Sequence, residues 1–173
     1  MNRKGPHKIG KGMIIAAWVV LLGLLTMYFS GVLDRQYNPN QSVQVRSDLD
    51  GDVDVVLKRN KFGHYVTSGK VNGVPVEFLV DTGATDVAVP ERLADSLGLE
   101  RGQATRYRTA NGVVTGYRTR IDTLSIGPLQ LRNVAASISP GMGDMDILLG
   151  MSVLKNVEFT QRGNELILRE HSP

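Results

Sequence analysis

The chain has 173 residues, of which 42% are hydrophobic, and this suits one modest folded domain with additional segments. It contains no cysteine, which excludes disulfide frameworks and cysteine nucleophiles. Its histidines, His7, His64 and His171, lack the spacing of metal ligands, so neither a metal site nor a cofactor is expected.

The net charge of +3 comes from the first twelve residues. Arg3, Lys4, Lys8 and Lys11 lie there, which leaves 16 basic against 17 acidic residues for the rest of the chain. A protein that binds nucleic acid is expected to carry its basic residues on the folded domain. Nucleic acid is therefore not an expected partner.

Residues 13–33 form an uncharged apolar run. As a helix its 21 residues would be about 31 Å long, which matches the hydrocarbon core of a bilayer. We therefore expect a single transmembrane helix, preceded by a basic cytoplasmic tail (residues 1–12) because basic flanks stay inside. A cleaved signal peptide is the alternative, but the run is long for one and lacks a clear small-x-small cleavage site.

Residues 34–52 are polar and contain Asn38-Pro39, so we expect them to form a linker to a domain at 53–173. From Val53 onward, short runs rich in β-branched and aromatic residues alternate with turn signals, which predicts an all-β domain. Asn72-Gly73 and Asn111-Gly112 each predict a tight hairpin. The expected strands are 53–57, 64–71, 74–80, 106–110, 113–120, 123–126, 131–138 and 165–168, with short helices at 91–99 and 150–154.

The main chemical signal is an aspartate at the end of an apolar strand, where Phe78-Leu79-Val80 leads into Asp81-Thr82-Gly83. An unpaired carboxylate is costly to bury unless partners surround it or its pKa shifts. Thr82 offers a hydroxyl, and Gly83 permits a tight turn and a close backbone approach. The tripeptide suits a turn that holds a carboxylate; an ordinary Asx turn at a strand end has the same local pattern.

A second apolar run that ends in glycine, residues 147–150 (Ile-Leu-Leu-Gly), repeats this strand-and-turn pattern. Together with residues 79–84 it resembles the retropepsin-type aspartic proteases. The N-terminal anchor and residues 69–73, 109–112 and 149–152 resemble the membrane-anchored bacterial members of that clan. The resemblance extends over about Val53 to Arg169, and it implies a retropepsin-like closed β-barrel with one or two short helices.

The resemblance also implies a function. In this family each of two subunits supplies one catalytic aspartate, and a hairpin flap closes over an extended peptide. This implies a membrane-anchored aspartic endopeptidase, active as a homodimer, with its catalytic domain on the periplasmic side of a bacterial inner membrane. The implied catalytic residues are Asp81, Thr82 and Gly83, with Thr82 bonded across the dimer; the implied flap is about residues 105–118, and the substrate contacts are Ala84, Thr109, Ala110, Asn111 and Gly112.

The chemistry also favours two chains. Two carboxylates that share a proton activate water well, and the chain has no second Asp-Thr-Gly or Asp-Ser-Gly. Asp144 and Asp146 are an alternative partner within the chain. Retroviral members commonly place Arg and then Asn or Asp after the second glycine, whereas Met151-Ser152 stands here. The alternative function is therefore a non-catalytic peptide-binding or assembly module on the same fold.

Overall fold

The structure, a computed structural model, describes residues 7–47, 53–109 and 112–170. Two units divide the chain, Met1–Gln36 and Tyr37–Pro173. Helix α1 (His7–Tyr37) contains the apolar run expected at 13–33 and continues to Tyr37. Its segment Gly10–Tyr37 contains an 18-residue window with a mean hydropathy of 2.2 and is long enough to cross a membrane.

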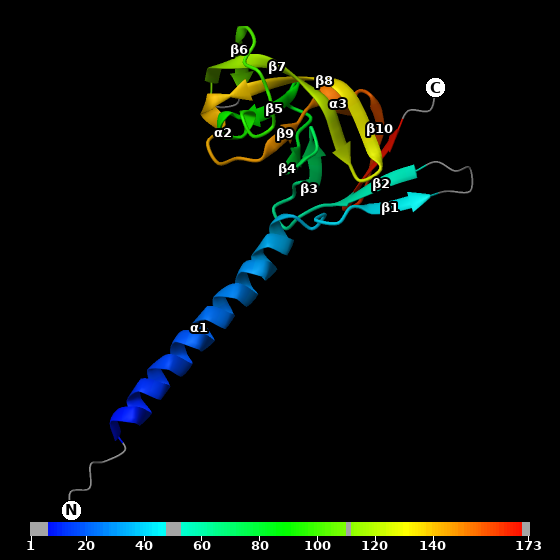
Figure 1. The fold of residues 1–173 in the computed structure, drawn as a ribbon. Coiled ribbons are helices and arrows are strands. Elements are labelled where there is room, and N and C mark those ends of the chain that lie inside the picture. The colour runs from blue at the N-terminus through cyan, green and yellow to red at the C-terminus, as the bar shows by residue number, and fades with distance from the viewer. Residues whose placement is uncertain (1–6, 48–52, 110–111, 171–173) are drawn as a thin grey trace, which may run out of the picture. The chain divides into compact units, whose positions relative to one another are not determined.

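The second unit is built around one closed sheet. Its strand order is β3 (Val66–Val71), β4 (Val74–Val80), β9 (Ile147–Leu149), β5 (Val87–Pro90), β8 (Leu129–Ser139), β7 (Gly112–Ile126) and β6 (Ala104–Thr109). Because β3 also pairs with β7, with Val71 opposite Leu124, the first six of these strands close into a barrel (Figure 1). The structure thus confirms the predicted all-β closed barrel.

The barrel interior holds the apolar side chains of these strands. Phe78 on β4, Leu124 on β7 and Leu149 on β9 are all fully buried in one cluster. Removing a side chain of this size from water contributes about 1.5–3 kcal/mol. The same apolar residues that mark β4 and β9 in the sequence therefore fix the two strands that end at the glycine-containing turns.

A second sheet has the order β1 (Gln44–Ser47), β2 (Val53–Lys58), β11 (Glu165–Glu170) and β10 (Val157–Arg162). Its inward residues join the same core, while an ion pair lies on its other face. There the Arg169 guanidinium donates to both carboxylate oxygens of Asp54, at 2.7 and 3.1 Å. This pair lowers the pKa of Asp54 through the hydrogen bonds from Arg169.

The segment expected to be a linker (34–52) is partly built into the folded unit. Asn38 and Asn40 are 1% and 2% exposed, and residues 44–47 form β1. The Asn40 side chain donates to the carbonyls of Lys58 and Val66 (2.9 and 2.7 Å) and accepts from the Lys58 N–H (2.7 Å). Residues 48–52 lie outside the described residues. Asn40 is buried by satisfying strand backbone groups, which a search for apolar periodicity does not detect.

Other differences concern the lengths of elements. The strands expected at 113–120 and 123–126 are one continuous strand, β7, and the first expected helix is shorter, since α2 covers only Glu91–Ala94. Strands β1, β5 and β10 were not predicted. The Asn72-Gly73 hairpin is confirmed, with φ of 49° and 83° at its two central residues, and the second helix is present as α3 (Met151–Leu154).

Candidate active site

Asp81 directly follows β4 and begins a tight turn. Strands β4 and β9 run parallel, with Val80 opposite Leu149, so the Asp81 turn and the Gly150 turn leave the barrel at the same end. The Asp81 N–H donates to the Leu149 carbonyl at 3.1 Å, which joins the two turns directly. The two turns, which begin at Asp81 and Gly150, 69 residues apart in the sequence, are therefore neighbours in space.

Gly83 orients the Asp81 carboxylate. Its backbone N–H donates to Asp81 Oδ1 at 2.8 Å, and the Ala84 N–H donates to the Asp81 carbonyl at 3.2 Å. A Cβ at position 83 would stand 3.1 Å from that same Oδ1, so glycine leaves the space in which the carboxylate sits. Asp81 is partly exposed, so its carboxylate is accessible from solvent.

The second turn supports the backbone that follows Asp81. The N–H groups of Met151 and Ser152, at the start of α3, donate to the carbonyls of Ala84 and Thr85 at 2.9 and 3.1 Å. A Cβ at Gly150 would stand 2.7 Å from the Ala84 carbonyl oxygen. The two backbones are in contact there, and only glycine fits between them.

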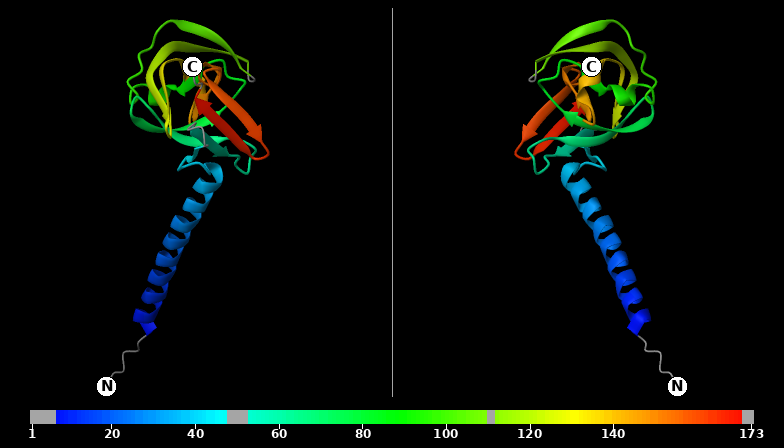
Figure 2. Two further views of the ribbon diagram at one scale, coloured as in Figure 1. Left: turned by 90° about the vertical axis from the view of Figure 1, so that its right-hand side faces the viewer. Right: turned by 90° about the vertical axis from the view of Figure 1, so that its left-hand side faces the viewer.

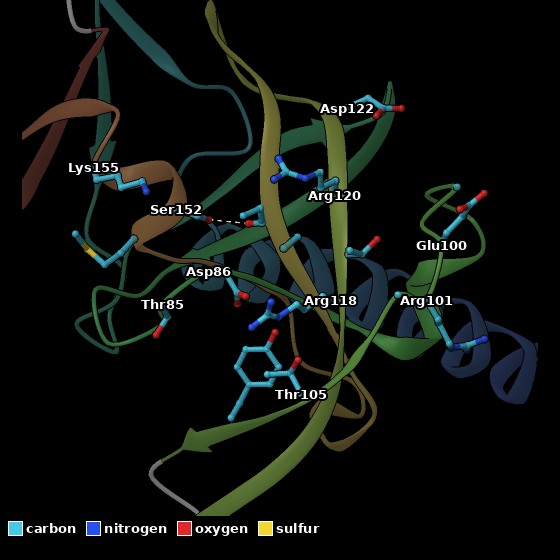
Figure 3. Close-up of a pocket in the computed structure, with 17 residues that line it drawn as sticks. Thr85, Asp86, Glu100, Arg101, Thr105, Arg118, Arg120, Asp122, Ser152 and Lys155 are labelled. Atoms are coloured by element: carbon cyan, nitrogen blue, oxygen red, sulfur yellow. Dashed lines mark hydrogen bonds between the residues drawn. The ribbon is translucent and has the colours of Figure 1, made fainter.

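Ser152, which stands where retroviral members have Asn or Asp, links three elements. Its buried hydroxyl accepts from the Val87 N–H of β5 at 3.1 Å and donates to the Ala135 carbonyl of β8 at 2.8 Å, the bond drawn dashed in Figure 3. Ser152 therefore links α3 to β5 and β8, near the Asp81 turn, within a single chain.

The other expected site residues lie on two elements. Thr82 is exposed in the Asp81 turn, and its hydroxyl makes no hydrogen bond with any described residue. Strands β6 and β7 pair from Ala104–Tyr117 to Thr109–Gly112, and this confirms a two-stranded ribbon where the flap was expected (Figure 2). Ala110 and Asn111, at the tip expected for this flap, lie outside the described residues. The roles of these residues in substrate binding remain predictions.

A cavity of about 1050 Å³ lies between the segment that follows the Asp81 turn and the base of this ribbon. Thr85 and Asp86 line it from that segment, and Thr105, Tyr107 and Arg118 line it from the ribbon (Figure 3). Its lining does not include Asp81, Thr82 or Gly83, so the cavity lies beside the turn rather than at it.

Asp86 is a site residue that the sequence analysis missed. Burial raises the pKa of its carboxyl, while hydrogen bonds from the hydroxyls of Ser137 (2.9 Å) and Tyr107 oppose this shift. Ser137 lies 51 residues away in the sequence and meets Asp86 because β5 and β8 pair in parallel, with Val87 opposite Ala136. The only sequence signal was an acidic residue just before an apolar run, and it indicates no partner.

The two aspartates considered as partners within the chain are held elsewhere. Asp146 accepts a hydrogen bond from the Tyr37 hydroxyl, and the fully exposed Asp144 lies 3.7 Å from the Arg92 guanidinium. Neither is hydrogen-bonded to Asp81 in the part of the chain that the structure describes. The structure thus gives no support to an aspartate pair formed within one subunit.

Comparisons with known proteins agree with this geometry. Residues 67–156 match the family described as "gag-polyprotein putative aspartyl protease". A Sinorhizobium sp. protein, described as uncharacterized and encoded in the cobV 5' region, is 33% identical over 179 residues, which cover 95% of this chain and 76% of that protein. An uncharacterized Rickettsia prowazekii protein is 33% identical over 119 residues, or 66% of this chain and 50% of its own length.

Among solved structures, the crystal structure of a retropepsin-like aspartic protease from Rickettsia conorii is 32% identical to this chain. The match has a TM-score of 0.57 and covers 75% of this chain and 94% of that one. The fold, the paired turns and these relatives lead to one assignment: the chain belongs to the family of retropepsin-like aspartic proteases.

Proposed function

We propose that this protein is a membrane-anchored aspartic endopeptidase that acts as a homodimer. The observation that carries the proposal is the Asp81 turn, in which the Gly83 N–H holds one carboxylate oxygen at 2.8 Å and the second turn braces the backbone behind it. The carboxylate is oriented before substrate arrives, as acid–base catalysis requires.

In the proposed reaction, two copies of Asp81 share one proton, because like charges a few ångströms apart cannot both ionise cheaply. The ionised carboxylate takes a proton from water as the water oxygen bonds to the scissile carbonyl carbon. The protonated carboxyl donates to the carbonyl oxygen. The C–N bond then breaks. The leaving nitrogen takes the proton that came from water, and one hydroxyl of the tetrahedral intermediate gives its proton to the other carboxylate as the new carboxyl group forms, so the pair again shares one proton.

Two observations support a second copy as the source of the other carboxylate. The chain has one Asp-Thr-Gly; of the other candidate acids, Asp146 accepts a hydrogen bond from Tyr37 and Asp144 is fully exposed, 3.7 Å from Arg92. Thr82, which the family resemblance assigns to a bond across the dimer, is exposed and has no hydrogen-bond partner among the described residues. The dimer would be isologous, with the same surface used by both subunits.

The proposal places the protease domain on the periplasmic side of an inner membrane, with the N-terminus in the cytoplasm. The length and hydropathy of α1 support a single membrane span. The four basic residues before the apolar run at 13–33 favour a cytoplasmic N-terminus. Two chains anchored in one membrane also meet at a higher effective concentration, which favours a dimer.

The test is cleavage of a mixed peptide library by the full chain in detergent, followed by mass spectrometry. The variants are Asp81→Asn and, as a matched control, Asp144→Asn, which changes an exposed carboxylate outside the site. We expect fragments from the wild type and the control, and a loss of at least about 100-fold with Asp81→Asn. Peptides bound but recovered intact from all three folded proteins would instead favour the binding module.

A further inference from the structure

One surface of the folded unit combines three exposed, largely apolar side chains around Tyr37. Tyr37, Phe62 and Met145, here called the collar, are 39%, 59% and 50% exposed. They come from three separate parts of the chain. Single exposed apolar residues are ordinary on a protein surface, but several exposed apolar residues close together mark a candidate interaction surface.

The buried side chain of Asn60 fixes Phe62 beside Tyr37. Its Nδ2 donates to the Tyr37 carbonyl at 2.9 Å, while its Oδ1 accepts from the N–H groups of Phe62 and His64 at 3.0 and 2.9 Å. The Lys61 ammonium lies 5.0 Å from the centre of the Phe62 ring. The loop is therefore tied down, and Phe62 is held outward.

Met145 is fixed beside Tyr37 from the other direction. The Tyr37 hydroxyl donates to the carboxylate of Asp146, the next residue along the chain from Met145. The Arg92 guanidinium donates to the carbonyl oxygens of Gly143 and Met145 at 3.0 and 3.1 Å. The segments that carry Phe62 and Met145 are thus each hydrogen-bonded to Tyr37, the last residue of α1.

The length of α1 beyond the apolar run sets the depth of Tyr37 in a bilayer. The apolar run ends at Leu33, and four further helical residues reach Tyr37 after a rise of about 6 Å. The headgroup layer on one side of a bilayer is about 5–7 Å thick. A helix that spans the hydrocarbon core over residues 13–33 therefore delivers Tyr37 to the outer part of that layer.

We infer that the collar is a lipid-contacting surface, seated in the headgroup region of the same bilayer that α1 crosses. This inference rests on the membrane anchorage proposed above. Aromatic rings favour this interface, and a lysine beside one can extend its ammonium toward the headgroups. The charges nearby, Lys61 and Arg92 against Glu77, Asp144 and Asp146, give no net positive charge, so the contact does not require anionic lipid.

A contact of this kind also bears on the dimer. A domain seated on the membrane loses much of its freedom to tumble, so two anchored chains meet with a restricted set of orientations. Part of the rotational entropy that the two subunits must lose to bring their Asp81 turns together is then lost already on binding to the membrane, so dimer formation costs less.

The experiment uses the full chain in phosphatidylcholine vesicles whose acyl chains carry bromine, a short-range quencher of tryptophan fluorescence. The wild type has a single tryptophan, Trp18 in α1, which reports whether the anchor is inserted. In a Trp18→Phe background, Phe62→Trp probes the collar. Phe159→Trp is the matched control, because Phe159 is an exposed aromatic residue (43%) on β10.

We expect bromine near the top of the acyl chains to quench the Phe62→Trp protein, with blue-shifted emission, and to leave the Phe159→Trp protein unquenched. Quenching of the wild type through Trp18, without quenching of the Phe62→Trp protein, would contradict lipid contact by the collar and leave the membrane anchor supported. If neither protein were quenched, both the anchor and the lipid contact would be contradicted. Blue-shifted emission from the Phe62→Trp protein that bromine does not quench, and that shifts back when the protein is diluted in lipid, overturns the collar in favour of a second copy of the chain.

Discussion

Replacing Gly150 by alanine tests whether the second turn supports the catalytic one. The added Cβ would stand 2.2 Å from the carbonyl oxygen of Asp86 and 2.7 Å from that of Ala84. Both are backbone atoms, so relief requires the loop after Asp81 to move by about 1 Å, as overpacked sites do. The Met151 N–H to Ala84 carbonyl bond, now 2.9 Å, would be stretched beyond hydrogen-bonding range by such a movement.

Overpacking of this kind costs about 1–3 kcal/mol, which for a folded unit of this size lowers the Tm by up to about 10 °C. A misplacement of about 1 Å at a catalytic group costs about 100-fold in rate. We therefore expect Gly150→Ala to lower both the Tm and kcat/KM.

The assay is thermal unfolding and peptide cleavage by the full chain in detergent, beside Gly141→Ala, whose added Cβ would meet its nearest neighbour at 3.9 Å. The control should match the wild type. A Gly150→Ala protein with unchanged Tm and activity would refute the close-contact reasoning.

Two further substitutions address the residues behind the turn. Ser152→Ala leaves the Val87 N–H and the Ala135 carbonyl without their partner, so we expect the free energy of unfolding to fall by about 1–3 kcal/mol in denaturant titrations. Ser152→Thr, which keeps the hydroxyl, should largely restore it. An unchanged unfolding midpoint in Ser152→Ala would contradict this. Asp86 has a raised pKa in the fold, so its charged form costs stability as pH rises above its ordinary value near 4. Asp86→Asn should raise the Tm at pH 7 and give no gain below pH 4; a gain of equal size at both pH values would contradict the titration argument.

The parts of the site that the sequence predicts are those encoded locally. Asp81, Gly83 and the strand before them are contiguous, so a turn that holds the carboxylate is predicted from local residues, whereas its catalytic role is implied by the family resemblance. The second turn is encoded in the same way, by an apolar run and Gly150. An all-β domain is also predictable, since runs with β-strand character are separated by Asn-Gly turns, whereas the closed barrel is implied by the family resemblance.

The parts that the sequence does not predict depend on register between distant strands. Asp86 meets Ser137 only because Val87 lies opposite Ala136, and one step of slip would turn every side chain of β5 to the other face. Asn40 is a polar residue in a polar stretch, and its burial follows from unpaired backbone groups on β2 and β3 that no local pattern reveals. Such residues require the structure.

The departure at Met151-Ser152 changes what one subunit must supply to the other. The loop behind Asp81 is held within its own chain, by the N–H groups of Met151 and Ser152 and by the Ser152 hydroxyl. No charged side chain takes part in these hydrogen bonds between described residues. In the proposed dimer, the partner therefore contributes the second carboxylate and the hydrogen-bond partner of Thr82 but not the geometry of the first carboxylate, so a separated subunit keeps a formed Asp81 turn and lacks the group that shares its proton.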